Sequence, residues 1–205
     1  MLARLITLFV PPLCLACGAD AGRAAPLCRS CRAQMHGSAP VCAAAAWAAF
    51  PYDGPAGALV RALKFGGRTA VADVMAGQIA ALVPPDLLRG AVVPVPVHPD
   101  HRRRRGVDHA AALGKALARR AGLAYAPCLV RGGDPLQQVG RGRTARMCGP
   151  AGPVTVRPGI EPPGEALLVD DVITTGATLT ACISALRVAG TQRITPVAYA
   201  RTTAR

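Results

Sequence analysis

Two adjacent carboxylates and a group of hydroxyls stand together near the end of the chain. Asp170 and Asp171 close an apolar run that begins at Ala166. The residues that follow them are Thr174, Thr175, Gly176, Ala177 and Thr178. Carboxylates suit ribose hydroxyls or a hydrated magnesium ion, and a glycine turn lets backbone amides approach an anion. The segment therefore predicts a site for a phosphorylated ligand. An ordinary strand, turn and helix rich in Asp and Thr is the simpler alternative.

The spacing of apolar residues predicts the elements that hold this site. Residues 166–169 form a continuous apolar run, typical of a buried strand, that ends at the two carboxylates. Leu179, Cys182, Ile183 and Leu186 then follow at i, i+3, i+4 and i+7, which predicts a helix. Open α/β sheets bind their ligands at the carboxyl ends of their strands, which is where these polar residues lie.

Four cysteines near the start of the chain have the spacing of a metal site. They are Cys14, Cys17, Cys28 and Cys31, two CxxC pairs separated by ten residues. Two such pairs can close a tetrahedral Zn²⁺ site, and the metal would supply folding energy to a segment too small for a core of its own. Two disulfides or a redox-active pair are the alternatives. No thioredoxin-like pattern adjoins the pairs, so we favour structural zinc. Cys42 stands alone.

Further elements are expected between these two motifs. Residues 43–50 are interpreted as an alanine-rich joint. Helices are predicted over 57–65, from about 69 to 83, and from Asp108, as the N-cap, to about Gly122. Strands are predicted over 91–97, near 127–130 and over 193–200. Residues 132–153 are rich in glycine and proline without apolar periodicity, which predicts a flap.

The charge of the chain is strongly basic and unevenly placed. The 205 residues carry a formal net charge of +13. Residues 101–146 hold eleven Lys and Arg against two Asp. Such a field suits a pyrophosphate group or a nucleic-acid backbone, and a solvated arginine surface is the alternative. No apolar run approaches the ~20 residues of a membrane span. Pro11 and Pro12 interrupt the short apolar start, so we expect a cytoplasmic protein rather than an exported one.

The order of these motifs resembles that of the ComF family, competence-associated proteins of the type I phosphoribosyltransferase superfamily. Its members carry a zinc module, a Leu-Lys-Phe helix, a Pro-Val-Pro loop, an Arg-Gly segment, a Gln-bearing flap and a phosphoribosyl pyrophosphate (PRPP) motif. The corresponding segments are 14–31, 63–65, 94–96, 105–106, 138–140 and 170–178. The resemblance implies an α/β phosphoribosyltransferase fold, a mostly parallel sheet flanked by helices, preceded by a zinc ribbon.

The resemblance also implies roles for single residues. Asp170 and Asp171 would be the catalytic carboxylates beside the ribose hydroxyls, with Mg²⁺ accompanying PRPP. The residues expected to contact PRPP are Thr174, Thr175, Gly176, Ala177, Thr178, Pro94, Val95, Pro96, Arg102, Arg105 and Lys64. Independently of the resemblance, His98 and His109 are candidates for proton transfer, and a surface or capping role is the alternative for each.

The departures from the family pattern concern the acceptor side. Val107, Asp108 and His109 stand where members usually have Phe-Asn-Gln. The acceptor is therefore not specified, and the expected function is transfer or sensing of the phosphoribosyl group. The alternative is a non-catalytic accessory protein in DNA uptake. The expected domains are 1–45 and 46–205, with the flap at 132–153. The expected partners are PRPP, single-stranded DNA or competence-machinery proteins, and a second copy of the chain.

Overall fold

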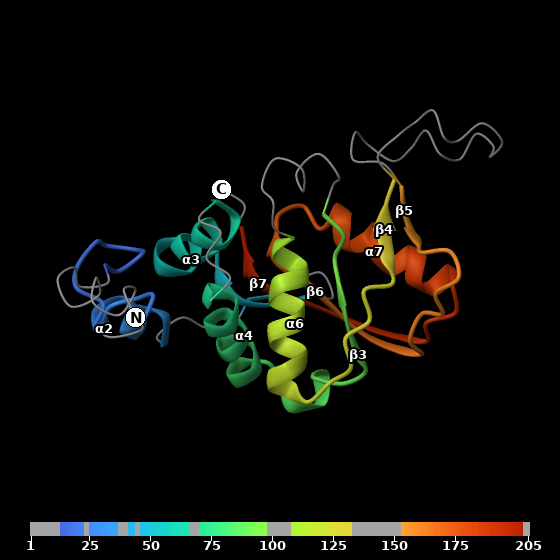
Figure 1. The fold of residues 1–205 in the computed structure, drawn as a ribbon, viewed down its shortest axis with the longest axis horizontal. Coiled ribbons are helices and arrows are strands. Elements are labelled where there is room, and N and C mark those ends of the chain that lie inside the picture. Colours follow the sequence, from blue (N-terminus) through green and yellow to red (C-terminus); the bar gives the residue numbers. More distant parts are fainter. Residues whose placement is uncertain are drawn as a thin grey trace, which may run out of the picture.

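The computed structural model describes residues 13–22, 25–36, 41–43, 46–65, 70–97, 108–132 and 153–202. Figure 1 shows the arrangement of the elements. In chain order they are α2 (Arg29–His36), β1 (Val41–Ala43), β2 (Ala46–Pro51), α3 (Gly54–Phe65), α4 (Ala70–Leu82), η1 (Pro85–Leu87), β3 (Ala91–Pro94), α6 (His109–Ala121), β4 (Leu129–Arg131), β5 (Val154–Val156), β6 (Glu165–Ile173), α7 (Ala177–Val188) and β7 (Arg193–Arg201).

Five strands form the main sheet, in the order β1–β2–β7–β6–β3. Strands β2, β7, β6 and β3 run parallel to one another, and β1 pairs antiparallel with β2 at one edge. Strand β6 lies in the interior of the sheet, where Leu168 is opposite Val93 on one side and Pro196 on the other. The fold is therefore α/β with a four-strand parallel sheet flanked by helices.

Both faces of the sheet are covered, as parallel sheets require. Because successive side chains of a strand point to opposite faces, β6 contributes to two separate cores. Leu167 and Val169 pack with residues of α3, α4 and α6, whereas Ala166 and Leu168 pack with α7 and the β4–β5 ribbon. Figure 1 shows α4 and α6 side by side on the first face and α7 beside the ribbon.

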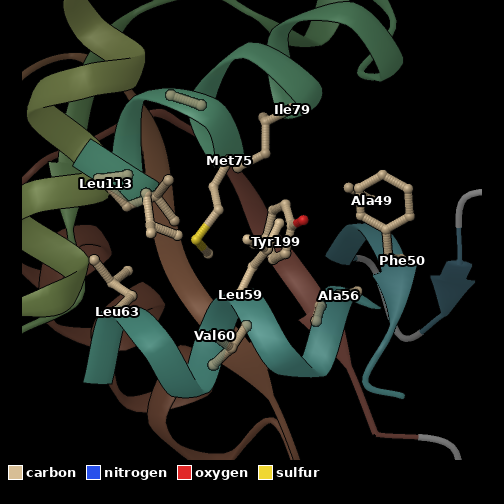
Figure 2. Packing of buried hydrophobic residues seen from close by; sticks show 14 of the residues in the cluster. Ala49, Phe50, Ala56, Leu59, Val60, Leu63, Met75, Ile79, Leu113 and Tyr199 are labelled. Carbon is tan, nitrogen blue, oxygen red and sulfur yellow. The ribbon is translucent and has the colours of Figure 1, made fainter. Parts of the chain in front are cut away.

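The larger core is built around Tyr199 of β7. Leu59 of α3 and Met75 of α4 are fully buried and converge on this side chain (Figure 2). The Tyr199 ring lies 5.3 Å from the ring of Phe50, centroid to centroid. Its hydroxyl donates to Oε1 of Gln78 at 2.7 Å, so the one polar group of the side chain is satisfied. Burial raises the pKa of Tyr199, which keeps it a neutral donor.

The N-terminal segment shares this core. Leu27 and Met35 belong to the same hydrophobic cluster as Trp47 of β2. The side-chain amide of Gln78 lies 3.7 Å from the Met35 sulfur, so Gln78 contacts both α2 and β7. The division expected at residue 45 stays a prediction.

One segment differs from its sequence interpretation. Residues 43–50 were expected to form a joint, but Ala46–Pro51 is strand β2, paired in parallel with β7. Alanine has little intrinsic strand preference, which concealed the strand. Ala48 and Ala49 have no solvent exposure, so burial on both faces of the sheet decides the conformation here.

The predicted helices over 57–65, 69–83 and 108–122 correspond to α3, α4 and α6. Asp108 is the N-cap of α6, accepting from the Ala111 amide at 2.9 Å, and Gly122 ends the helix with φ 66°. In the described part of the chain, no helix has the length and apolar character needed to cross a bilayer.

Candidate functional site

The two carboxylates at the end of β6 face opposite sides of the sheet. Asp171 is buried on the face covered by α3, and its Oδ1 lies 3.1 Å from Nζ of Lys64 at the end of that helix. Asp170 lies on the face covered by α7, and its Oδ1 accepts the Asp171 amide at 2.8 Å. Burial, followed by the charge of Asp170, raises the pKa of Cys182 in α7 to about 12.

The environment of Asp170 favours its protonated form. Removal from water, followed by repulsion from Asp171, raises the pKa of Asp170 to about 7, and Lys64 offsets part of this rise. The carboxyl therefore exchanges its proton near neutral pH. A divalent cation or a hydroxyl donor at this position would favour the ionised form, because it would replace the solvation that burial removes.

The turn after β6 leaves the start of α7 open. Gly176 is the N-cap with φ 79°, a left-handed conformation that glycine adopts without strain. Because this N-cap residue is glycine, it offers no side-chain acceptor to the first helical amides. One of the first amides, that of Ala177, donates to the Thr175 hydroxyl at 3.4 Å. The first turn of a twelve-residue helix thus presents N–H groups and a positive dipole end at this position.

The end of β3 forms a second wall. The Val95 amide donates to the Val169 carbonyl at 2.9 Å, which continues the pairing of β3 with β6 past the last strand residue. Helix α6 approaches this strand closely at Gly114, where a Cβ atom would lie 3.4 Å from Val92 and 3.6 Å from Pro94. Pro94 therefore lies against α6 and is not among the residues that line the pocket, whereas Val95 and Pro96 do line it.

Predicted residues from three separate segments line one pocket of about 470 Å³ at this edge of the sheet. They are Lys64, Val95, Pro96, Asp170, Asp171, Thr174 and Thr178. Thr175 and Gly176 belong to the adjoining turn, and Ala177 begins α7. Arg102, Arg105, His98 and most of the flap expected at 132–153 lie outside the described residues. His109, singled out for proton transfer, is buried in the pocket wall.

The pocket also contains residues that the sequence reasoning missed. Tyr52 and Thr202 follow β2 and β7, and Tyr52 is joined to β7 by its amide, which donates to the Arg201 carbonyl at 2.7 Å. Recognising β2 as a strand would have placed Tyr52 at the same edge. Arg131 of β4 donates from a terminal nitrogen to the Thr178 hydroxyl at 3.3 Å. No local pattern signals this contact, because it depends on where the ribbon packs.

The four cysteines meet in a separate cluster. Their Sγ atoms all lie within 4.8 Å of one another. The 3.7 Å between the Sγ atoms of Cys17 and Cys28 is close to the ~3.8 Å that two thiolates on one tetrahedral zinc ion would have, and far from the ~2.05 Å of a disulfide. Gly18, with φ 74°, forms the tight turn after the first pair. The second pair lies at the start of α2.

The thiols of this cluster differ in their tendency to ionise. Burial opposes ionisation of Cys14, but backbone N–H groups of Cys28, Cys17 and Ala16 outweigh it and lower the pKa of Cys14 to about 6. Burial, followed by hydrogen bonds from the neighbouring thiols, raises the pKa of Cys31 to about 12. Four thiolates in one place require a cation, and a zinc ion has the charge and geometry to supply it.

Comparison with known families supports this interpretation of the N-terminal segment. Residues 5–59 match the family model of the double zinc ribbon domain, and the match covers about a quarter of the chain. The one further cysteine in this range is Cys42. The chain thus begins with a four-cysteine zinc ribbon, consistent with structural Zn²⁺, followed by the α/β domain. No curated protein matches the chain.

Proposed function

We propose that this protein binds PRPP together with magnesium and transfers or senses the phosphoribosyl group. The observation that carries the proposal is the convergence of the predicted residues on one pocket at the carboxyl edge of the parallel sheet. A pocket of about 470 Å³ falls within the usual range for small ligands, ~300–1,000 Å³. The resemblance of segments 63–65, 94–96 and 170–178 to the ComF family supports the same conclusion.

Each wall of the pocket suits one part of PRPP. The open amides at the start of α7, with Thr174 and Thr178, suit the 5′-phosphate. Asp170 and Asp171 suit the ribose hydroxyls, and carboxylate oxygens are ligands that Mg²⁺ accepts. The end of β3, with Lys64 nearby, suits the pyrophosphate. Arg102 and Arg105, which follow β3 in the sequence, are proposed to add positive charge there.

The same residues suit a transfer reaction. Magnesium, when bound, would neutralise the pyrophosphate and help it to leave. Departure of that group develops positive charge at C1′ of the ribose, and the carboxylates of Asp170 and Asp171 stabilise such charge electrostatically. A nitrogen nucleophile would then attack C1′. A sensor would keep the binding residues and lack only an acceptor.

Calorimetric titration with PRPP and magnesium tests the binding proposal. We expect Asp171→Asn and Thr175→Ala to abolish binding, because the first removes a carboxylate of the ribose site and the second alters the phosphate turn. Thr175 is exposed, so its replacement leaves the core intact. Asp73→Asn, at an exposed carboxylate on α4, is the matched charge control. Unchanged PRPP affinity in both pocket variants would refute the proposed site.

Release of pyrophosphate distinguishes an enzyme from a sensor. The wild-type protein is incubated with PRPP, magnesium and a panel of nucleobases and amines. Release that depends on one acceptor supports phosphoribosyl transfer and identifies the acceptor. PRPP binding without release for any acceptor supports the sensor.

A second candidate is an accessory role in DNA uptake, and the net positive charge of residues 101–146 favours it. Arginine-rich surfaces bind phosphate backbones without sequence preference, and the affinity falls as salt rises. We expect salt-dependent binding of single-stranded DNA that is lost when Arg102, Arg103, Arg104 and Arg105 are neutralised. The absence of binding at low salt would remove this candidate.

A further inference from the structure

Arg131 brings a second positive charge to the pocket from the face opposite Lys64. It ends β4, which packs on the α7 face, whereas Lys64 ends α3 on the other face. One terminal nitrogen of Arg131 donates to the Thr178 hydroxyl at 3.3 Å. Its Nε is buried and has no hydrogen-bond partner in the described part of the chain.

The charge of Arg131 lacks a counterion within the described residues. The ion pairs there are Lys64 with Asp171 and Arg119 with Asp73, so none of the described carboxylates is paired with this guanidinium. A half-buried cation with an unsatisfied N–H group is costly in the free protein. An anion that enters the pocket would remove both costs together.

The contact between Arg131 and Thr178 also leaves the Thr178 hydroxyl as a second donor in the pocket. A hydroxyl carries a single proton, and the Thr178 oxygen already accepts from Arg131. Its own proton is therefore available to another acceptor in the pocket. Arg131 and Thr178 thus present N–H and O–H donors beside the open start of α7, and guanidinium groups match the oxygen spacing of phosphate.

From this geometry we infer that Arg131 is a specificity-determining residue that selects ligands with a terminal phosphate monoester. The inference rests on the proposed function and concerns the 5′-phosphate end of the ligand. Arg131 raises the affinity for ligands that carry this phosphate. It does not raise the affinity for magnesium pyrophosphate, which binds at the β3 end of the pocket.

The test compares three probes: PRPP with magnesium, ribose 5-phosphate, and magnesium pyrophosphate. We expect Arg131→Gln to lower the affinities for PRPP and for ribose 5-phosphate by the same factor, about 10- to 100-fold. The affinity for magnesium pyrophosphate should not change. Arg131→Lys keeps the charge without the planar fork, so it should recover part of the loss. Arg157→Gln, at an exposed arginine just after β5, should change none of the three affinities.

The outcomes separate this inference from the proposed function. Wild-type protein that binds neither PRPP nor ribose 5-phosphate would overturn both. PRPP binding that is intact in wild type and unchanged in Arg131→Gln would overturn the inference alone. An equal loss for magnesium pyrophosphate would also overturn it, because a general field and not a phosphate contact would then be responsible. If Arg131→Gln does not fold, the same comparison is made with Arg131→Lys.

Discussion

The ion pair between Lys64 and Asp171 offers a quantitative test of the pocket's electrostatics. The two charged atoms lie 3.1 Å apart, and the side chains are 23% and 9% exposed. At an effective dielectric constant of ~20, the gross attraction at this distance is about 5 kcal/mol. Desolvation of both groups offsets much of this attraction. We expect a net coupling free energy of about 2 kcal/mol, between the values typical of exposed and buried pairs.

A double-mutant cycle measures this coupling. The wild type, Lys64→Met, Asp171→Asn and the double variant are unfolded with urea at pH 8, in a buffer without magnesium so that no divalent cation replaces the ammonium group. Lys64→Met should be the less stable of the single variants, because it leaves Asp171 without its ion-pair partner and Asp170 without a positive charge that favours its ionised form. The double variant should recover much of the loss.

The pair between Arg119 and Asp73 is a matched control. Its atoms are closer, at 2.6 Å, but the side chains are 66% and 56% exposed. Water screens these charges, so the Arg119→Met and Asp73→Asn cycle should give about 0.5 kcal/mol or less. If burial controls the coupling free energy, the Lys64–Asp171 pair has the larger one although its charged atoms are farther apart. Equal coupling free energies in the two cycles would refute this reasoning and, with it, the view of the pocket as a site of low dielectric.

Two further predictions follow from the pKa of Asp170 and from the cysteine cluster. The pKa of Asp170 is raised from 3.8 to about 7 on folding, so its contribution to stability is lost as pH rises through this interval. Urea midpoints at pH 5 and pH 8 should therefore show Asp170→Asn gaining stability relative to wild type at the higher pH; a constant difference would contradict the shifted pKa. Metal analysis should find one zinc per chain, and chelation should lower the melting temperature, since Leu27 and Met35 beside the cluster share the main core. Cys28→Ser should lose the metal and Cys182→Ala should retain it, whereas a folded protein with well under one equivalent of zinc would contradict the ribbon.

The residues of the two candidate sites could be selected from the sequence because they stand close together in it. Asp170, Asp171 and the turn around Gly176 occupy consecutive positions, and an apolar run followed by helical spacing is enough to predict the strand and helix that hold them. The two CxxC pairs are local in the same sense, and their sulfur atoms meet as the spacing predicted. Each of these features depends on contacts within a few residues or one short loop.

The tertiary structure decided what surrounds those residues. It decided which helix covers each of the two carboxylates, placed Lys64 against Asp171, and brought Arg131 to Thr178. These contacts depend on strand order and on which helices cover each face. Burial of the whole core determines both. It also determines the conformation of the alanines of β2, which form a strand because the sheet encloses them. Local sequence supplies the candidate functional groups, and the cooperative packing of distant segments determines their charge environment.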